Sequence, residues 1–253
     1  MGRIEKINSY YEKNFAELEK LHQILNEATA GNINADNYKI LGWESRQAQY
    51  ARFAAFVKNV NLEKKSILDV GCGLGDLFHF ITCALNNTIF YTGIDISERM
   101  IETAKSQLEI LRQNGLKLPA GNNSTVEFEK RDLFQDNFKD SYNWIYASGI
   151  FNLNLGNNLE FLEKAFKQFV ELGTDGFACS MLNERSTDKE EPYFYYKPEE
   201  VKLLAEKDVI KEYASIPSRE GLLTMLASGM IAYVKDLSIA LNLYAEKMEG
   251  EEN

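Results

Sequence analysis

The sequence predicts an α/β fold that is doubly wound, with helices on both faces of a mostly parallel sheet. Short runs of β-forming residues alternate with amphipathic helical runs from residue 66 to residue 182. This alternation favours parallel strands joined by right-handed crossovers. The first strand run leads into glycines at alternate positions, and later strand runs end on acidic residues. Because ligands of such folds bind beyond the carboxyl ends of the strands, these residues predict one site there.

Two helices are expected ahead of the first strand. Apolar residues recur at nearly helical spacing over residues 4–28, and a second helix is predicted over Ser45–Val57 with Ser45 as its N-cap. Residues 32–38 between them are polar and typical of a loop. Helices in this position can cover the mouth of a ligand site.

The strand Ser66–Val70 is followed by Gly71, Gly73 and Gly75 and by a helical run, Asp76–Leu85. Glycine lets a ligand approach the backbone closely, so the turn can cradle a flat polar ligand. Its G-x-G-x-G spacing differs from the G-x-G-x-x-G of dinucleotide-binding folds. Asp69, just before the turn, would repel a pyrophosphate but would suit an ammonium group. A glycine turn of this kind also occurs as a plain connection.

The following elements continue the alternation. Asp95 ends the next strand, at roughly the 20-residue distance where a doubly wound fold places the carboxylate that binds ribose hydroxyls. Ser97 is expected to cap the helix after it. The predicted elements in order are the strand Ile89–Asp95, a helix from Ser97 to Gln113, the strands Thr125–Lys130 and Tyr142–Ala147, the helix Asn157–Leu172 and the strand Gly176–Leu182.

The end of the chain departs from this pattern. A helix is expected to begin at Pro198, and Val209–Ile216 is a candidate last strand without a clean partner. Ser218–Met248 has helical apolar spacing, which predicts a homodimer interface or an added helical layer. The predicted division is a helical lid over residues 1–60, an α/β domain over 61–216 and a helical extension over 217–253.

Composition limits the partners. The chain has 253 residues and a formal net charge of −10, so nucleic acid and anionic membranes are poor electrostatic matches and a small-molecule substrate is expected. Three cysteines without a C-x-x-C pair indicate reduced thiols and no metal site. Without an apolar leader, and with no apolar run longer than residues 221–234, the sequence predicts a cytoplasmic protein.

The acidic residue followed by G-x-G-x-G resembles the first motif of the class I methyltransferases that depend on S-adenosylmethionine (SAM). The resemblance implies SAM as cofactor and in-line transfer of its methyl group to a small-molecule acceptor. In that family an acidic residue after the third strand binds the adenine amino group and the next residue packs on the ring. The implied cofactor site consists of Asp69, Gly71, Cys72, Gly73, Asp95, Ile96, Met100, Asp132, Leu133 and Ser148.

Aromatic residues supply the expected substrate or lid contacts. Tyr11 and Trp43 are either ordinary packing residues or an aromatic wall beside the sulfonium. Phe151 and Tyr195 are expected near the substrate, although the aromatics of residues 193–196 can equally pack on the sheet edge. The absence of an N-P-P-[YF] motif disfavours methylation of nucleobases and amides. His22 and His79 are expected on helix surfaces, and no catalytic side chain is predicted.

Two other functions remain open from the sequence. An NAD(P)-dependent oxidoreductase would share the fold but is disfavoured by the glycine spacing and by Asp69. A non-catalytic SAM-binding or interaction protein is favoured only by the apolar C-terminal segment.

Overall fold

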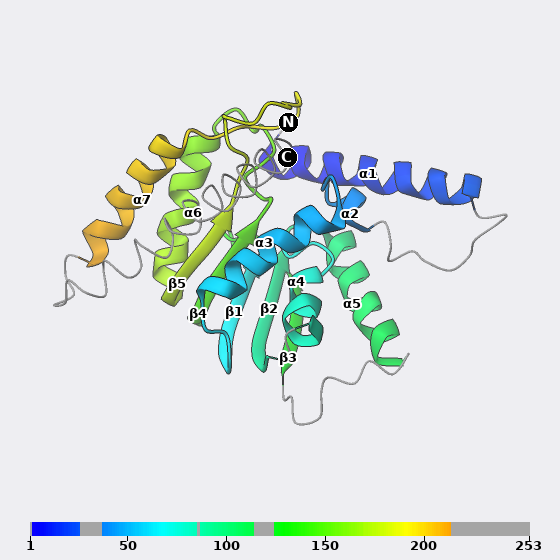
Figure 1. The fold of residues 1–253 in the computed structure, drawn as a ribbon, viewed down its shortest axis with the longest axis horizontal. Helices are drawn as coiled ribbons and strands as arrows, with labels where there is room; N and C mark the ends of the chain where they lie inside the picture. The colour runs from blue at the N-terminus through cyan, green and yellow to red at the C-terminus, as the bar shows by residue number, and fades with distance from the viewer. Residues whose placement is uncertain (1, 26–36, 85–86, 114–123, 214–253) are drawn as a thin grey trace, which may run out of the picture.

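Five parallel strands form the centre of the fold in the computed structural model, which describes residues 2–25, 37–84, 87–113 and 124–213 (Figure 1). Their order across the sheet is β3-β2-β1-β4-β5. Because β1 and β4 are neighbours in the centre, the strand order reverses beside β1, which is where such sheets bind ligands. The strands are β1 (Lys65–Val70), β2 (Ile89–Asp95), β3 (Thr125–Lys130), β4 (Tyr142–Ser148) and β5 (Gly173–Ser180).

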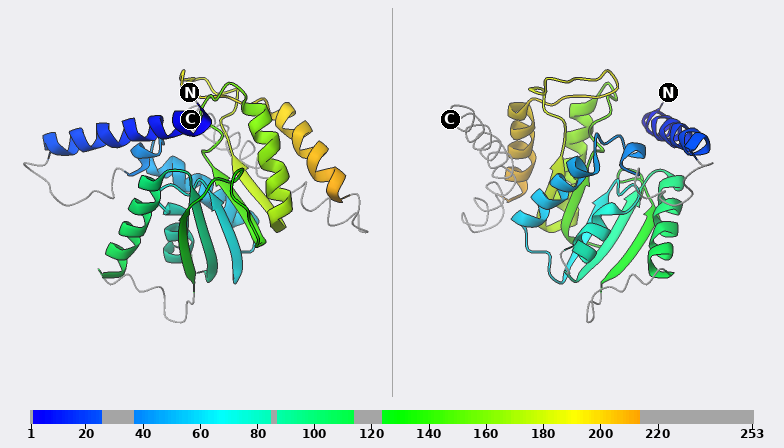
Figure 2. Two further views of the ribbon diagram at one scale, coloured as in Figure 1. Left: turned by 180° about the vertical axis from the view of Figure 1, so that it is seen from behind. Right: turned by 45° about the vertical axis from the view of Figure 1, so that its right-hand side comes forward.

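Helices cover both faces of the sheet, as the predicted doubly wound class requires. One buried cluster joins β1 and β2 to α3, α4 and α5, and a second cluster packs α6 and part of α7 on the other face. Figure 2 shows the sheet from behind, with α6 and α7 on that side. The helices are α1 (Arg3–Leu25), α2 (Asn37–Ile40), α3 (Arg46–Asn59), α4 (Asp76–His79), α5 (Glu98–Gln113), α6 (Asn158–Leu172) and α7 (Pro198–Tyr213).

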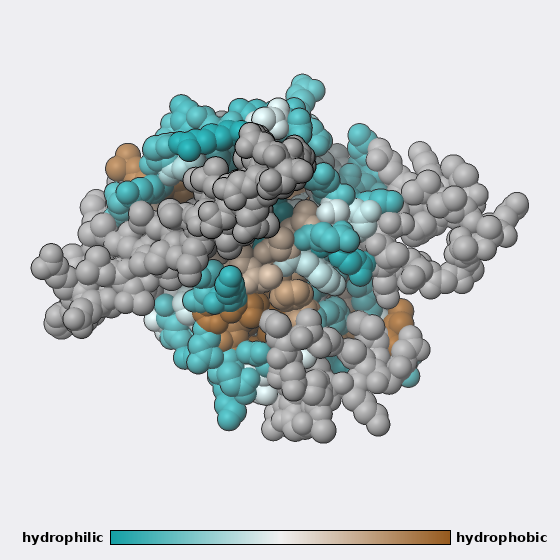
Figure 3. Space-filling view, in the orientation of Figure 1, coloured by the Kyte–Doolittle hydropathy of each residue, from teal (hydrophilic) through white to brown (hydrophobic). Residues whose placement is uncertain are grey.

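α1 and α2 lie at the carboxyl ends of the strands, whereas α3 crosses one face of the sheet (Figures 1 and 2). The backbone N–H of Ala48 donates to Ser45 Oγ at 3.1 Å, so Ser45 caps α3 as predicted. The outer surface of α3 exposes the small apolar residues Ala51 and Ala54, and the brown area in the middle of Figure 3 lies over this helix.

Most strand predictions agree with the structure. The bounds of β2 and β3 are as predicted, and β1 and β4 are each one residue longer. The β5 prediction was displaced, because the strand begins at Gly173 and ends at Ser180. The Cβ of any larger residue at position 173 would lie 2.9 Å from the carbonyl oxygens of Phe169 and Gly176, so Gly173 allows the strand to start directly after α6.

The helix predicted after the glycine turn is present but irregular, and the candidate last strand is helical over its described residues. The helix expected over Asp76–Leu85 is α-helical only to His79 and continues as a π-helical turn, Phe80–Ala84, in which the Thr82 hydroxyl donates to the Phe78 carbonyl at 2.7 Å. Residues 209–213 of the candidate last strand belong to α7, because the helix begun at Pro198 continues through them.

The C-terminal extension and its predicted dimer contact lie outside the described residues. The division into a lid, an α/β domain and an extension stays a prediction. Among the described helices, none is long and apolar enough to cross a membrane.

Candidate functional site

The glycine turn after β1 has a backbone shape that larger residues would not permit. Gly71, Gly73 and Gly75 all have positive φ, at 73°, 53° and 79°. A Cβ at Gly71 would lie 2.1 Å from Ile150 Cγ2, so a side chain is excluded there by contact as well as by φ. Neighbouring side chains therefore pack directly on the turn, and Gly71 and Gly73 line the pocket at the carboxyl end of β1.

Asp95 ties the end of β2 to this turn. Its Oδ2 accepts a hydrogen bond from Gly73 N at 3.1 Å, and its Oδ1 accepts one from Ser97 N at 2.9 Å. Burial raises the pKa of Asp95 to about 6, and the backbone donors partly offset that effect. Because a carboxylate oxygen can accept more than one hydrogen bond, both oxygens can also receive hydroxyl groups of a ligand.

Asp69 is buried at the end of β1, with 4% of its surface exposed. The hydroxyl of Tyr91 on β2 donates to its Oδ2. Burial raises the pKa of Asp69 to about 7, and the hydrogen bond from Tyr91 opposes that rise. The charge of this carboxyl group therefore changes near neutral pH.

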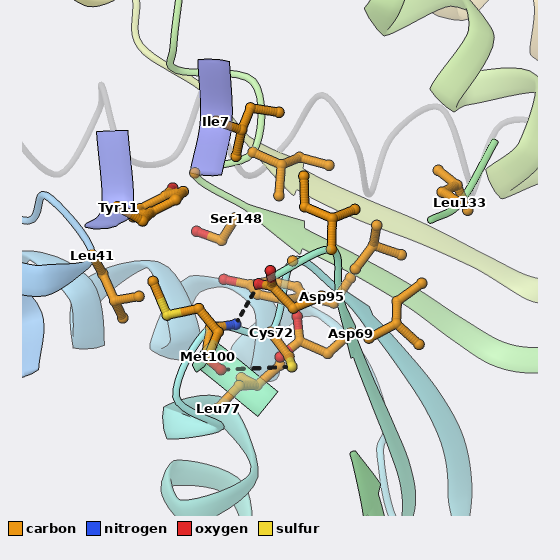
Figure 4. A pocket seen from close by; sticks show the side chains of 18 of the residues that line it. Ile7, Tyr11, Leu41, Asp69, Cys72, Leu77, Asp95, Met100, Leu133 and Ser148 are labelled. Carbon is orange, nitrogen blue, oxygen red and sulfur yellow. Dashed lines mark hydrogen bonds between the residues drawn. The ribbon is translucent and has the colours of Figure 1, made fainter. Parts of the chain in front are cut away.

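One pocket collects these groups, with an empty volume of about 1030 Å³ that includes its mouth. Figure 4 shows Asp69, Asp95, Cys72, Met100 and Ser148 around it, with the hydrogen bond from Gly73 to Asp95 dashed. The structure brings together all ten residues of the implied cofactor site, and Tyr11 and Trp43 line the same pocket. Their individual roles stay predictions.

The first turn of α1 reaches the far side of this pocket. Arg3 forms an ion pair with Asp132, and its guanidinium lies 4.7 Å from the ring centre of Phe134. Phe134 N donates to Asp132 Oδ1 at 2.9 Å. Further along α1, burial and the charge of Asp95 raise the pKa of Tyr11, whose hydroxyl therefore stays protonated.

Cys72 is buried within the turn, and burial raises the pKa of its thiol. A buried thiol of this kind is a poor nucleophile, so Cys72 contributes packing rather than chemistry.

The predictions for Phe151 and Tyr195 were wrong, because neither residue lines the pocket. Phe151 is 0% exposed and packs among Phe161 and Phe169 of α6. The Tyr195 hydroxyl bonds within its own loop, accepting from Glu190 N at 2.9 Å. Tyr193 faces α1 instead, with its hydroxyl 2.7 Å from that of Tyr10.

His79 also differs from its prediction as a surface residue. It is partly buried beside Phe78, neither ring nitrogen has a hydrogen-bond partner among the described residues, and burial lowers its pKa. The side chain of His22 lies outside the described residues.

The sequence analysis missed several polar residues that line the pocket, among them Arg3, Gln49, Asp76, Arg131 and Tyr146. One signal was available for Gln49, which shares the buried face of α3 with Phe53 and Phe56. A polar residue on such a face needs a buried partner. The partner is Asp76, whose Oδ2 accepts from Gln49 Nε2 at 2.9 Å.

Comparison with known proteins agrees with this geometry. The protein family described as "Methyltransferase domain" matches residues 61–216. The chain belongs to this family. The matched residues therefore form a methyltransferase domain.

Several solved structures overlap parts of the chain. A SAM-dependent methyltransferase from Aquifex aeolicus is 22% identical over 70% of this chain and 88% of its own, with a TM-score of 0.46. Coclaurine N-methyltransferase bound to N-methylheliamine and S-adenosylhomocysteine is 20% identical over 66% of this chain and 49% of its own, with a TM-score of 0.40. The YcgJ protein of Bacillus subtilis is 19% identical over 51% of this chain and 49% of its own, with a TM-score of 0.38. The family assignment rests on the family match alone.

A short segment resembles a protein of another kind. The large ribosomal subunit protein uL10 of Lactobacillus helveticus is 48% identical over 48 residues, which are 19% of this chain and 28% of that protein. The uL10 protein of Lactobacillus acidophilus is 50% identical over the same length. The chain spans little more than a quarter of these relatives, so their ribosomal role is not carried over to it.

Proposed function

We propose that this methyltransferase acts on a small molecule, which binds beside SAM in the pocket at the carboxyl ends of β1, β2 and β4. The observation that carries the proposal is the cover over the pocket. Tyr11 from α1 and Leu41 from the segment between α2 and α3 lie on one side of it in Figure 4, and Trp43 from the same segment also lines it. A covered pocket suits a compact acceptor better than a polymer, and the net charge of −10 also disfavours nucleic acid.

The residues on the strand ends suit the parts of SAM. Asp95 would hold the ribose hydroxyls, since its carboxylate is already oriented by two backbone N–H groups. Asp132 and Leu133 would bind the adenine ring, and Asp132 would then share its carboxylate with Arg3. The ammonium end of the cofactor would donate to backbone carbonyl groups of the glycine turn and to the carboxylate of Asp69.

The bound cofactor supplies a methyl group that its sulfonium has already activated. The protein then has to orient the acceptor in line with that group and exclude water. Trp43 and Tyr11 supply aromatic surface, which favours a nearby cation. Because the cofactor is already activated, the pocket needs no nucleophilic side chain.

The test has two stages. Calorimetric titration with SAM, S-adenosylhomocysteine (SAH) and NADH should show binding of the first two alone. SAM with a deuterated methyl group is then incubated with the protein and a small-molecule extract, with RNA and protein fractions in parallel. Deuterated methyl in a small molecule is expected. Label only in RNA or protein would refute the small-molecule proposal, and SAM binding without transfer would leave a binding protein.

A further inference from the structure

Part of the pocket is lined by polar groups that the cofactor assignment leaves unused. It lies between α3 and β4, and we call it the α3–β4 half. Its residues are Trp43, Gln49, Phe53, Asp76 and Tyr146. Tyr146 belongs to β4 and Asp76 begins α4, whereas Asp95 and Asp132 follow β2 and β3.

Gln49 holds the carboxylate of Asp76 in place. Gln49 is only 3% exposed, and its Nε2 donates to Asp76 Oδ2 at 2.9 Å. Burying an amide is unfavourable without such a bond, so the pair fixes both side chains. None of the described residues donates to the other oxygen, Asp76 Oδ1, which leaves it available to a ligand.

Tyr146 adds a buried hydroxyl group that lacks a partner. The residue is 3% exposed, and its ring packs against Phe53 and Phe56 with centroid distances of 6.2 and 4.6 Å. None of the described residues forms a hydrogen bond of normal geometry with its hydroxyl, and the nearby Ser148 hydroxyl is already bonded to that of Ser180 at 2.7 Å. A buried hydroxyl without a partner is costly, and a ligand in the pocket would supply one.

The charges around the α3–β4 half favour a cation. Among the described residues that line the pocket, the basic side chains are Arg3 and Arg131, and both lie at the β3 end. Arg3 pairs with Asp132, and Arg131 pairs with Glu129 at 3.4 Å. One cation also reaches this half, because the guanidinium of Arg52 lies on the Trp43 ring. The carboxylates of Asp76 and Asp69 outnumber it, so an ammonium group would be attracted and a carboxylate or phosphate group repelled.

Aromatic rings complete the site. Trp43 and Phe53 supply apolar surface, and one face of Trp43 already receives the guanidinium of Arg52, 4.5 Å from the ring centre. An acceptor with an apolar or aromatic body and a basic nitrogen matches this combination of carboxylate, hydroxyl and rings.

We propose that the acceptor is a small amine whose nitrogen is bound by Asp76 and Tyr146, with Gln49 as the positioning residue for Asp76. This inference rests on the proposed function. The bound ammonium group first loses one proton to solvent past the Asp76 carboxylate. The neutral nitrogen then uses its lone pair to form the new C–N bond, and the electron pair of the S–CH₃ bond remains on sulfur. The products are the methylated ammonium, SAH and the one released proton.

The binding test uses three probes with the same body. The protein saturated with SAH is titrated with phenethylamine, 2-phenylethanol and 3-phenylpropanoate at pH 7.5. Phenethylamine is expected to bind at least about tenfold more tightly than the other two, because one charge-assisted hydrogen bond is worth about that factor. Equal or tighter binding of the alcohol or the acid would overturn the proposal, as would failure of all three to bind.

Variants separate the acceptor site from the cofactor site. Asp76→Asn and Tyr146→Phe are expected to weaken phenethylamine binding about tenfold while leaving SAH affinity within about twofold. Tyr146→Phe should also retain the melting temperature, because it removes a hydroxyl that has no partner. Gln49→Met should raise the KM for the amine more than it lowers kcat. Asp140→Asn, an exposed carboxylate away from the pocket, is the matched control.

Two results would contradict the assignment of these residues. If Asp76→Asn weakens SAH binding and spares the amine, Asp76 belongs to the cofactor. If the deuterated products of the extract are methyl ethers or esters, the acceptor is not an amine. If the proposed function itself is wrong, the result is different. Deuterium label is then absent from every small-molecule fraction, whichever of the three probes binds most tightly.

Discussion

Replacing Asp69 with Asn should stabilise the protein without its cofactor at alkaline pH. Burial raises the pKa of this carboxyl from 3.8 to about 7. The ionised side chain is therefore disfavoured in the folded state. Each pH unit between the two pKa values corresponds to about 1.36 kcal/mol. Above pH 7 the ionised Asp69 therefore lowers the free energy of unfolding by at most about 4 kcal/mol. Asn removes the charge and can still accept the hydrogen bond from Tyr91.

The sign of the pH dependence follows from the raised pKa. The folded state binds this proton more tightly than the unfolded chain does, so the stability that Asp69 contributes is complete below about pH 4 and is lost as pH rises through about 7. The stabilisation by Asp69→Asn should therefore be about 2–4 kcal/mol at pH 8 and should approach zero near pH 4.

Urea unfolding of both proteins at several pH values measures this difference. Asp95, whose pKa is raised to about 6, is present in both proteins, so its own titration largely cancels in the comparison. A variant that is less stable than the parent at pH 8 would refute the reasoning. A difference that stays constant between pH 5 and pH 8 would do so as well, because the effect would not come from ionisation.

Three other predictions concern the same pocket. SAM affinity should fall as pH is lowered from 8 to 5.5, because Asp69 takes up a proton below about pH 7, and calorimetry should find a flatter profile in Asp69→Asn. Asp95→Ala should weaken SAM binding by about 1–3 kcal/mol, and unchanged affinity would remove Asp95 from the cofactor site. Gly71→Ala should lower stability by about 1–3 kcal/mol more than Gly156→Ala, because both have positive φ but only Gly71 meets a neighbour, Ile150, within 4 Å. Equal losses in thermal unfolding would contradict this contact.

The sheet could be predicted closely because its strands carry local signals. β2 and β3 have the predicted bounds, since each is a short β-forming run that ends at an acidic residue or at a polar turn. The position of the pocket could be predicted for the same reason, because the glycine turn is also a local signal. Residues adjacent in sequence determine the turn, and parallel topology then brings Asp95 and Asp132 beside it.

The α3–β4 half of the pocket could not be predicted from local sequence signals. Gln49 and Asp76 belong to different helices, and only the packing of α3 on the sheet brings them to 2.9 Å. Phe151 shows the opposite error, because an aromatic residue after a strand end is equally suited to a pocket or to the core. Here α6 provides aromatic neighbours that bury it completely.

Arg3 and Tyr10 connect α1 to two separate parts of the fold. Arg3 pairs with Asp132 after β3, and the Tyr10 hydroxyl lies 2.7 Å from that of Tyr193 in the segment after β5. The ion pair is partly buried, so separating it costs more than separating a surface pair. If α1 moves away when SAH exchanges for SAM, both contacts break, and substitutions in this helix would then change the turnover rate without changing the methyl-transfer step.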